Sequence, residues 1–269
     1  MIIKSLEKAI DFLFLFTAQQ PLLSLPEIAK KLTIPESTAY RLLVTLRKKN
    51  IIAQDSETKK YGVDARVLRL QMAASARLDI CKMAAPHLET LSAVSGETCQ
   101  LYLQQGDEVV CAEVVSSLNA IAFMPDKGRS FPLHAPAGGR AVLAFLPEPF
   151  LSQYIARGLK SLTPCTVTDS GELVRALLKV RKDGFAVSAQ QVYPGVGGVA
   201  APVFDHRGAV IASMAVTGPD TRVTSERART LGPLVVREAQ TLSAGLGALP
   251  GRSEWKKGGR DLPAELESA

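Results

Sequence analysis

Apolar residues recur at helical spacing through the first eighteen residues of the chain. The stripe predicts a helix over 3–18 and consists of Leu6, Ala9, Ile10, Leu13 and Phe14. Phe12, Leu15 and Phe16 lie beside it and widen the apolar arc beyond the ~100° that a single core contact requires. We therefore expect this helix to pack on its own core and also on a second copy of the chain. The alternative is a helix sandwiched inside its own domain.

The next two segments have the pattern of a helix-turn-helix. A short helix is expected over 24–32, followed by Thr33 and Ile34 as a tight turn and by a second helix over 35–49. One face of the second helix is apolar and consists of Ala39, Leu42, Leu43 and Leu46. The opposite face carries hydroxyl and cationic side chains, namely Ser37, Thr38, Arg41, Thr45 and Lys48. Such side chains suit base edges and phosphates, so this face predicts a DNA-reading helix.

Two short strands, expected at 51–53 and 61–63, flank the polar turn 54–60 and complete a winged helix-turn-helix. The predicted contacts to base edges and nearby backbone come from Ser37, Thr38, Tyr40, Arg41 and Thr45. The predicted phosphate contacts come from Lys48, Lys59 and Lys60, the last two at the tip of the wing. Tyr40 lies at the edge of the reading face, so a packing role is the alternative for it.

The remainder of the chain predicts a linker helix and a larger domain. Helices are expected at 64–79, 82–95, 137–146, 149–156, 170–182 and 224–246, the last with an irregularity at Gly232 and Pro233. Strands are expected at 98–103, 109–115, 120–124, 185–188, 198–203 and 210–217, with a turn-rich loop at 125–132. This order predicts an α+β fold, with a central antiparallel sheet flanked by helices. The predicted divisions are a winged domain at 1–63, a linker helix at 64–79, a larger domain at 80–249 and a disordered tail at 250–269.

Composition indicates a globular chain whose positive charge is concentrated near its start. Of 269 residues, 46% are hydrophobic and 22% are charged, which is enough to bury a core. Residues 1–79 carry thirteen Lys and Arg against eight Asp and Glu, whereas residues 80–269 carry nineteen against eighteen. This uneven distribution of charge predicts one module that binds nucleic acid and a second module with a different function.

Cysteine and histidine positions predict neither a zinc site nor a disulfide framework. The four cysteines (Cys81, Cys99, Cys111 and Cys165) form no CxxC pair, and the three histidines complete no zinc spacing. We expect the cysteines to be small buried hydrophobes in a reduced compartment. Charged residues interrupt any signal peptide, and the longest apolar run is far below a membrane span. These features predict a cytoplasmic protein with no metal and no cofactor.

Two other classes of function compete with a DNA-binding regulator. The first is an enzyme, for instance a hydrolase using Cys99 or Cys111 with His134, although no cysteine lies in a nucleophile-like string. The glycines at 195–198 follow no strand-to-helix pattern of the dinucleotide-binding type. The second is a small-molecule sensor that acts by protein contact. The intact polar face of the helix over 35–49 argues against that alternative.

Several strings of this chain together resemble the isocitrate-lyase-regulator (IclR) family of bacterial transcription factors. In the N-terminal part they are residues 5–9 (SLEKA), 25–32 and 37–43 (STAYRLL). In the larger domain they are residues 134–147 (HAPAGGRAVLAFLP), 184–187 (GFAV), 199–205 (VAAPVFD) and 216–219 (VTGP). The resemblance covers about residues 3–248 and rests on the order and spacing of these strings.

The resemblance implies a winged helix-turn-helix joined by a linker helix to a GAF-like effector-binding domain. It also implies a non-enzymatic regulator of a catabolic operon, which binds a partly palindromic promoter site as a homodimer or homotetramer. Two-fold symmetry shared by protein and operator is the usual geometry for helix-turn-helix dimers. Such regulators typically answer to a small organic or aromatic acid.

Effector positions carried over from the resemblance fall on Ala120, Phe123, Gly138, Ser188, Gly198, Ala215 and Thr217. Small residues beside an apolar wall favour a ring or a longer chain over a two-carbon acid. Gly139 joins the site because the segment 138–140 opens a helix whose free N–H groups could accept a carboxylate. Gln190 joins it because it alternates with Ser188 on a predicted strand.

Each of these assignments has an ordinary structural alternative. Gly198 could serve only a backbone turn over 195–198, and Ser188 and Gln190 could satisfy backbone groups. Arg140 could be a surface residue that caps a neighbouring loop. His134 lies in an extended stretch before Pro136, and we expect it to be structural.

Overall fold

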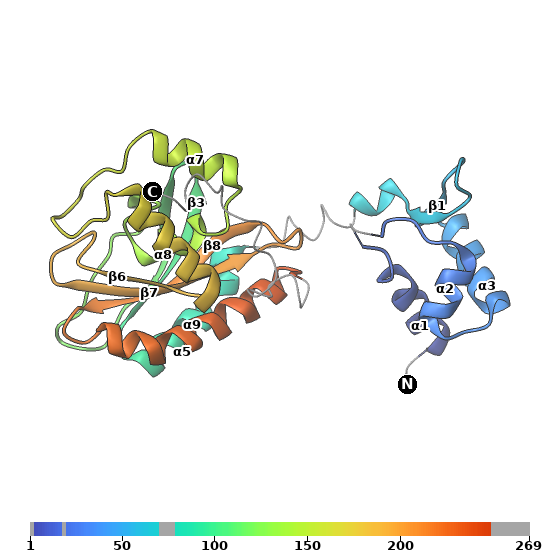
Figure 1. Ribbon diagram of the computed structural model, residues 1–269. Coiled ribbons are helices and arrows are strands. Elements are labelled where there is room, and N and C mark those ends of the chain that lie inside the picture. Colours follow the sequence, from blue (N-terminus) through green and yellow to red (C-terminus); the bar gives the residue numbers. More distant parts are fainter. Residues whose placement is uncertain (1–2, 18–19, 70–78, 249–269) are drawn as a thin grey trace. The chain divides into compact units, whose positions relative to one another are not determined.

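The computed structural model describes residues 3–17, 20–69 and 79–248 and divides the chain into two compact units, one within 1–78 and one within 79–269 (Figure 1). Most of the expected linker helix, at 70–78, lies outside the described residues, as does the expected tail at 250–269. The described start of the linker is a 3-10 turn, η1 (Ala65–Val67), in which the Asp64 side chain accepts from the Arg66 N–H.

The first unit contains a helix-turn-helix followed by a two-stranded hairpin. Its elements are α1 (Lys4–Leu13), α2 (Leu25–Leu32), α3 (Glu36–Lys48), β1 (Ile52–Gln54) and β2 (Tyr61–Val63). The strands pair antiparallel, and Leu23 adds a single bridge to Tyr61 on the other side of β2. The expected helices and hairpin are therefore present, with ends that differ by a few residues.

Local hydrogen bonds define both ends of α2. Ser24 and Glu27 form a capping box at the start of α2, in which the Glu27 carboxylate accepts from the Ser24 N–H at 2.7 Å. These hydrogen bonds lower the pKa of Glu27. At the other end Thr33 adopts a left-handed conformation with φ 54°, and the Ile34 N–H closes on the Ala29 carbonyl at 3.1 Å. The chain thereby reverses within three residues before α3 begins.

Replacing Thr33 with glycine should stabilise the first unit. A left-handed backbone costs a residue with a Cβ roughly 1–2 kcal/mol, while glycine loses more entropy on folding, so the expected net gain is about 0.5–1 kcal/mol. Urea denaturation followed by circular dichroism would measure it. Asn50→Gly is the matched control, because Asn50 has φ 55° but asparagine tolerates this region well. An equal gain at both positions would contradict the explanation.

The orientation of α1 differs from the expected one. Phe12 is its fully buried residue and packs against α2 and α3 in a core with Leu23, Ile28, Ala39, Leu43 and Ile52. Of the stripe expected to face the core, Leu13 packs against it, whereas Leu6, Ile10 and Phe14 are exposed, as is Ile3 just before the helix. Both faces of the helix are apolar, and the face carrying Phe12 is the one that the unit covers itself.

The second unit is a six-stranded sheet with helices on both faces (Figure 1). Its helices are α5 (Ile80–Ser95), α6 (Ala137–Leu143), α7 (Glu148–Ala156), α8 (Ser170–Asp183) and α9 (Ser225–Gly245), which runs through Pro233. Its strands are β3 (Thr98–Gln105), β4 (Glu108–Val115), β5 (Ser130–Pro132), β6 (Ala186–Ala189), β7 (Val196–Phe204) and β8 (Val210–Pro219). The strand order is β5-β4-β3-β8-β7-β6 and every neighbouring pair is antiparallel, which confirms the expected α+β class.

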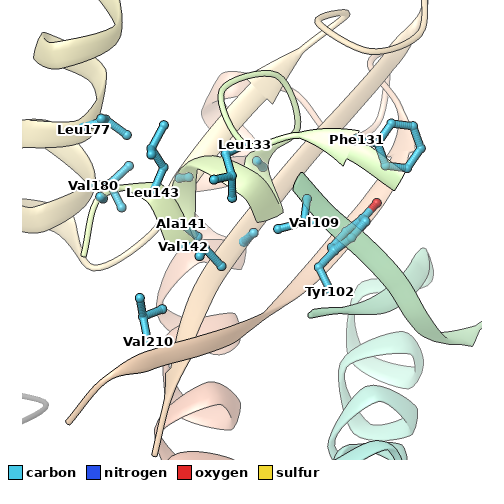
Figure 2. Close-up of a cluster of buried hydrophobic side chains, with 14 of the residues drawn as sticks. Tyr102, Val109, Phe131, Leu133, Ala141, Val142, Leu143, Leu177, Val180 and Val210 are labelled. Carbon is cyan, nitrogen blue, oxygen red and sulfur yellow. The ribbon is translucent and has the colours of Figure 1, made fainter. Parts of the chain in front are cut away.

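The central strands are apolar on both faces because both faces are covered. On β7, Val199 and Ala201 face a core shared with α5 and α9, whereas Ala200 faces a core shared with α6 and α8. The second of these cores includes Tyr102, Phe131 and Leu133 (Figure 2). Strands buried on both faces appear in a sequence as nearly continuous apolar runs, which is why β7 and β8 could be predicted.

One expected strand is absent and one was missed. Residues 120–124 have no strand partners, and side chains hold their carbonyls instead. The Thr98 hydroxyl donates to the Phe123 carbonyl at 2.7 Å, and the Arg222 guanidinium donates to the Ile121 carbonyl at 2.7 Å. The loop expected over 125–132 contains β5, which pairs with β4. Apolar composition alone therefore mistook an anchored loop for a strand.

Candidate functional site

The outward face of α3 is polar and basic, and the inward face is buried. Ala39 and Leu43 are fully covered in the core of the first unit. The exposed positions follow helical spacing along one stripe and consist of Ser37, Tyr40, Arg41, Val44, Thr45 and Lys48. Thr38 is half-buried at the edge of this stripe. Tyr40, for which packing was the alternative, has 53% of its surface exposed and does not belong to the core.

Side-chain contacts leave most of this face available. The Thr45 hydroxyl donates to the Arg41 carbonyl at 2.8 Å, while no ion pair among the described residues includes Arg41. Exposed Val44, which the sequence analysis did not single out, adds an apolar group of the kind that contacts a thymine methyl. Arg47 and Lys49, also not singled out, extend the positive charge at the end of α3.

The tip of the wing is a tight, self-bonded turn. Asp55 accepts from the N–H and the hydroxyl of Thr58, and Lys59 has φ 59°. The Lys59 ammonium donates to the Ser56 carbonyl at 2.8 Å, and Lys60 is half-buried. Of the two lysines expected at the tip, Lys59 is therefore the more exposed.

The second unit contains a partly open cavity between the sheet, the start of α6 and the loops before β5 and β7. Its floor is formed by β7 and β8, through Val196, Gly197, Gly198, Ala215 and Thr217. Its walls comprise Tyr102, Phe123, Phe131, Pro136, Ala137, Gly138, Ser188, Gln191, Val192 and Tyr193. The mixture of apolar walls with a few polar groups is typical of a small-molecule site.

The cavity brings together six of the positions expected to bind an effector: Phe123, Gly138, Ser188, Gly198, Ala215 and Thr217. Three other expected positions are not among its lining residues. Ala120 is exposed on the loop after β4, and Gly139 packs on the backbone of Leu133. Gln190 has left β6 with φ 55°, so it does not share a strand face with Ser188.

Gly198 is a strand residue and not part of a backbone turn. It lies within β7, opposite Ser188 of β6 on one side and Thr217 of β8 on the other. A Cβ placed on it would lie 3.1 Å from the Ser188 hydroxyl and 3.6 Å from the Thr217 hydroxyl. Even a single Cβ would therefore crowd the Ser188 hydroxyl, so the absence of a side chain keeps the floor of the cavity open at this point.

Aromatic rings form much of the wall, and only Phe123 among them was expected. The Phe123 and Tyr193 rings are 5.4 Å apart, and Tyr193 meets Phe131 edge-on at 6.1 Å. Phe131 also contacts the Tyr102 ring at 6.3 Å (Figure 2). The Arg129 guanidinium lies 5.2 Å from the Tyr193 ring centre and also pairs with the Asp126 carboxylate at 3.7 Å. The wall is thus suited to a flat ring.

A buried amide lies beside the floor of the cavity. Gln100 of β3 is fully buried, opposite Ala215 of β8. Its Oε1 accepts from the Tyr102 hydroxyl at 2.7 Å and from the Thr217 hydroxyl at 3.2 Å. Its Nε2 is buried and has no hydrogen-bond partner. Sequence reasoning missed Gln100 because a glutamine within an apolar strand carries no signal of what surrounds it.

Arg140 and His134 are structural and buried. Arg140, for which a surface position was the alternative, is 4% exposed and donates to the Val187 carbonyl at 2.6 Å. Burial lowers its pKa to about 10. His134 contacts the Tyr154 hydroxyl at 2.6 Å and the Lys160 carbonyl at 3.0 Å. The Ala137 N–H at the start of α6 is occupied by the Ser188 hydroxyl at 3.2 Å, so it is not a free donor.

Cys99 and Cys111 are buried as expected, whereas Cys81 is only partly buried and Cys165 is exposed, so the expectation that all four cysteines are buried is wrong for these two. Burial raises the pKa of Cys99 to about 12 and that of Cys111 to about 11, whereas a reactive thiol needs a lowered pKa. In the described parts of the chain, no group of three or more potential ligands could hold a metal ion. No helix in those parts is long and apolar enough to cross a membrane.

Comparison with protein families gives two matches that together span most of the chain. Residues 5–56 match the IclR helix-turn-helix domain, and residues 72–244 match the C-terminal domain of bacterial transcriptional regulator IclR. The HTH-type transcriptional regulator BhcR of Paracoccus denitrificans is 33% identical over 246 residues, which cover 91% of this chain and 88% of BhcR.

Solved structures show the same two-domain layout. A crystal structure of an IclR-type transcriptional regulator from Silicibacter sp. TM1040 has a TM-score of 0.83 and 27% identity, covering 93% of this chain and 99% of that one. An IclR homologue from Microbacterium hydrocarbonoxydans, complexed with 4-hydroxybenzoate, has a TM-score of 0.57 and 22% identity, covering 90% and 99%. The second likeness concerns the fold alone.

Proposed function

Since this chain belongs to the IclR family of DNA-binding transcriptional regulators, we propose that it controls a catabolic operon in response to a small organic or aromatic acid. It binds a partly palindromic site in promoter DNA as a homodimer or homotetramer. The observation that carries the proposal is the outward stripe of α3, in which hydroxyl and cationic side chains follow one helical face over a buried apolar face.

Within this function the residues of the first unit divide into two roles. Ser37, Thr38, Tyr40, Arg41 and Thr45 reach base edges and the nearby backbone in the major groove. Lys48, Lys59 and Lys60 contact phosphates, and Lys59 must release its bond to Ser56 to do so. Glu57 at the same turn is exposed, so the wing contributes less positive charge than its two lysines suggest.

The outward face of α1 supports assembly into dimers. Ile3, Leu6, Ile10 and Phe14 form an exposed apolar stripe on a helix that already buries Phe12. An exposed stripe of this kind is typical of an interface, and a second copy presents the same stripe around a two-fold axis. Two copies of α3 would then address the two halves of a palindrome.

The cavity of the second unit supports the sensing role. Its aromatic wall accepts a ring, and the Thr217 and Ser188 hydroxyls supply polar groups at its floor. We propose that an aromatic acid bound there alters the separation of the two DNA-binding domains through the 64–79 segment and so changes their fit to two half-sites. A ligand that left half-site spacing preference and DNA affinity unchanged would contradict this mechanism.

The first test is the binding of the purified protein to the DNA upstream of its own gene and to a scrambled duplex, across a salt series. We expect a preference of about a thousandfold or more, with an affinity that falls steeply with log salt. Equal affinity for the upstream DNA and the scrambled duplex would exclude a specific operator there. Absence of binding at low salt would contradict DNA binding itself.

Replacing Gly198 with valine should make the regulator insensitive to ligand without unfolding it. The Cβ would lie 3.1 Å from the Ser188 hydroxyl, so Ser188 must shift slightly and the added methyl groups fill the floor of the cavity, while valine suits a strand position. Isothermal titration with 4-hydroxybenzoate should show at least a tenfold loss of affinity, while DNA binding remains. Ala189→Val is the matched control, because Ala189 is exposed on β6 next to Ser188. Equal loss in both variants would indicate damage to the sheet and not a filled cavity.

A further inference from the structure

Val44 lies at the centre of the outward face of α3. At about 100° per residue, the arc directly opposite the apolar face that packs on the core spans about 60°. This arc consists of Ser37, Arg41, Val44 and Lys48. Val44 keeps 44% of its surface exposed, and within the described part of the first unit it does not belong to the core. An aliphatic side chain therefore occupies the middle of a polar and cationic face.

The position of Val44 is more informative than its exposure. Isolated apolar residues are common on protein surfaces, so exposure alone indicates no function. A β-branched side chain also loses rotamer freedom in a helix, which makes valine a poorer helix former than alanine, lysine or arginine. Val44 does not offset this cost by packing on the core of its own unit. We therefore expect its methyl groups to be buried against whatever binds to the centre of this face.

The neighbours of Val44 favour DNA over a protein as that partner. Arg41 and Lys48 lie one turn before and one turn after it, on the same arc. The centre of a protein–protein interface is depleted of charged residues, and an apolar contact there needs a contiguous apolar patch. The contiguous apolar stripe of this unit is on α1. Cations around a single apolar residue instead suit a surface that combines phosphates with base edges.

A valine in the major groove can recognise one kind of group. The base edges there present hydrogen-bond donors and acceptors, together with a single apolar group, which is the C5-methyl of thymine. The side chain of Val44 has neither a donor nor an acceptor, so its contact with this methyl is the one that distinguishes bases. Tyr40 is exposed one turn earlier, at the i−4 position, where its ring can cover the same methyl from a second side.

The spacing along α3 also limits where this thymine lies. Val44 follows Arg41 by three residues, which is about 4.5 Å along the helix axis. Successive base pairs of DNA are about 3.4 Å apart. A thymine that contacts Val44 is therefore expected within two base pairs of the base that Arg41 contacts.

Resting on the DNA-binding function proposed above, we infer that Val44 is a specificity-determining residue that reads one thymine in each half-site. Its methyl groups pack on the thymine C5-methyl, and the Tyr40 ring closes the contact from the preceding turn. Cytosine presents an amino donor and no methyl at this edge, so it leaves Val44 without an apolar partner. The thymine lies within two base pairs of the base contacted by Arg41.

The test begins with the selection of sites that the full chain binds from a pool of random duplexes. Each thymine of the common site is then replaced by uracil, one position at a time in both half-sites. Uracil pairs as thymine does and lacks only the methyl group. We expect one replacement to weaken binding by about three- to tenfold per half-site, as for the loss of one buried methyl group, and the others to change it little. Fluorescence anisotropy would measure these affinities.

Val44→Ala assigns the sensitive thymine to a side chain. Alanine is the better helix former, so the variant keeps α3 intact. It should bind the thymine duplex about as weakly as the native protein binds the uracil duplex, and the same replacement should cost it less than about twofold. Val94→Ala is the matched control, because Val94 is an exposed valine on α5 of the second unit. This control should keep the native sensitivity to uracil, and circular dichroism of both variants checks folding.

The outcomes distinguish this inference from the function on which it rests. If the selected sites share a sequence in which no uracil replacement weakens binding, the inference is wrong while specific DNA binding stands. Equal sensitivity of Val44→Ala and the native protein would mean that another side chain contacts the methyl, which also overturns it. If selection returns no common sequence, specific DNA binding itself is wrong and the inference fails with it. A single sensitive thymine, silent only in Val44→Ala, would support the inference.

Discussion

Arg41→Ala should weaken binding to the operator by about ten- to a hundredfold for each half-site, while binding to unrelated DNA changes little. Arg41 is exposed in the middle of the outward stripe of α3, and none of the ion pairs in the described residues competes for its guanidinium. A bidentate contact from arginine to a base edge is worth about 1–3 kcal/mol of discrimination. Fluorescence anisotropy with operator and scrambled duplexes would measure both affinities.

The same titration needs a control for the loss of one positive charge. Arg66→Ala removes an exposed arginine from η1, outside α3, and should reduce binding to both duplexes slightly and equally. If Arg41→Ala also weakens the two duplexes equally, Arg41 contacts a phosphate and does not read a base. The salt dependence of binding would then become shallower by about one charge.

Phe14→Glu should abolish cooperative binding to the two halves of the operator. Phe14 is 78% exposed at the end of the apolar stripe of α1, and a carboxylate there would have to be buried against a second copy. Without that contact each DNA-binding domain binds its half-site independently. The affinity for the full palindrome should therefore fall by about a hundredfold or more. Operator binding and analytical ultracentrifugation would measure the two effects.

Phe14→Leu is the matched variant, since it keeps an apolar side chain at the same position. We expect it to preserve both the oligomeric state and the affinity for the full site. If Phe14→Glu leaves the oligomeric state and operator affinity unchanged, the stripe on α1 is not an interface between copies. Loss of both properties in the leucine variant would instead indicate that Phe14 is needed for the fold of α1.

The helices of the first unit were predictable because their periodicity reports burial directly. Ala39 and Leu43 are covered and Arg41 is not, as a 3.6-residue repeat requires. The same argument failed for α1, where Ile10 and Phe14 were expected in the core. A helix with two apolar faces gives no periodic signal that tells which face its own domain covers. That choice depends on where Ile28 of α2 and Leu23, which precedes α2, lie in the folded unit, and this is a matter of tertiary packing.

The only cavity residues that could be predicted were those carried over from the resemblance to known regulators. Ser188, Gly198 and Thr217 meet at the floor because β6, β7 and β8 pair in one register, which the sequence does not state. Phe131 and Tyr193 escaped notice because they come from segments that looked like ordinary loops. Spacing along the chain cannot bring them together, since it carries no information on strand order. The Phe131 and Tyr193 side chains come together only once the sheet has formed.

One wall of the cavity does not tolerate larger side chains. Every residue of α6 is buried, a Cβ on Gly138 would strike the Tyr102 ring at 2.5 Å, and one on Gly139 would strike the backbone of Leu133. Substitutions in α6 could therefore do little to adapt the cavity to a new compound. The opposite wall carries Phe123, Val192 and Tyr193 on loops, where side chains can vary without disturbing the sheet. Related regulators with this cavity would therefore come to recognise different ligands through substitutions in these loops, while α6 stays unchanged.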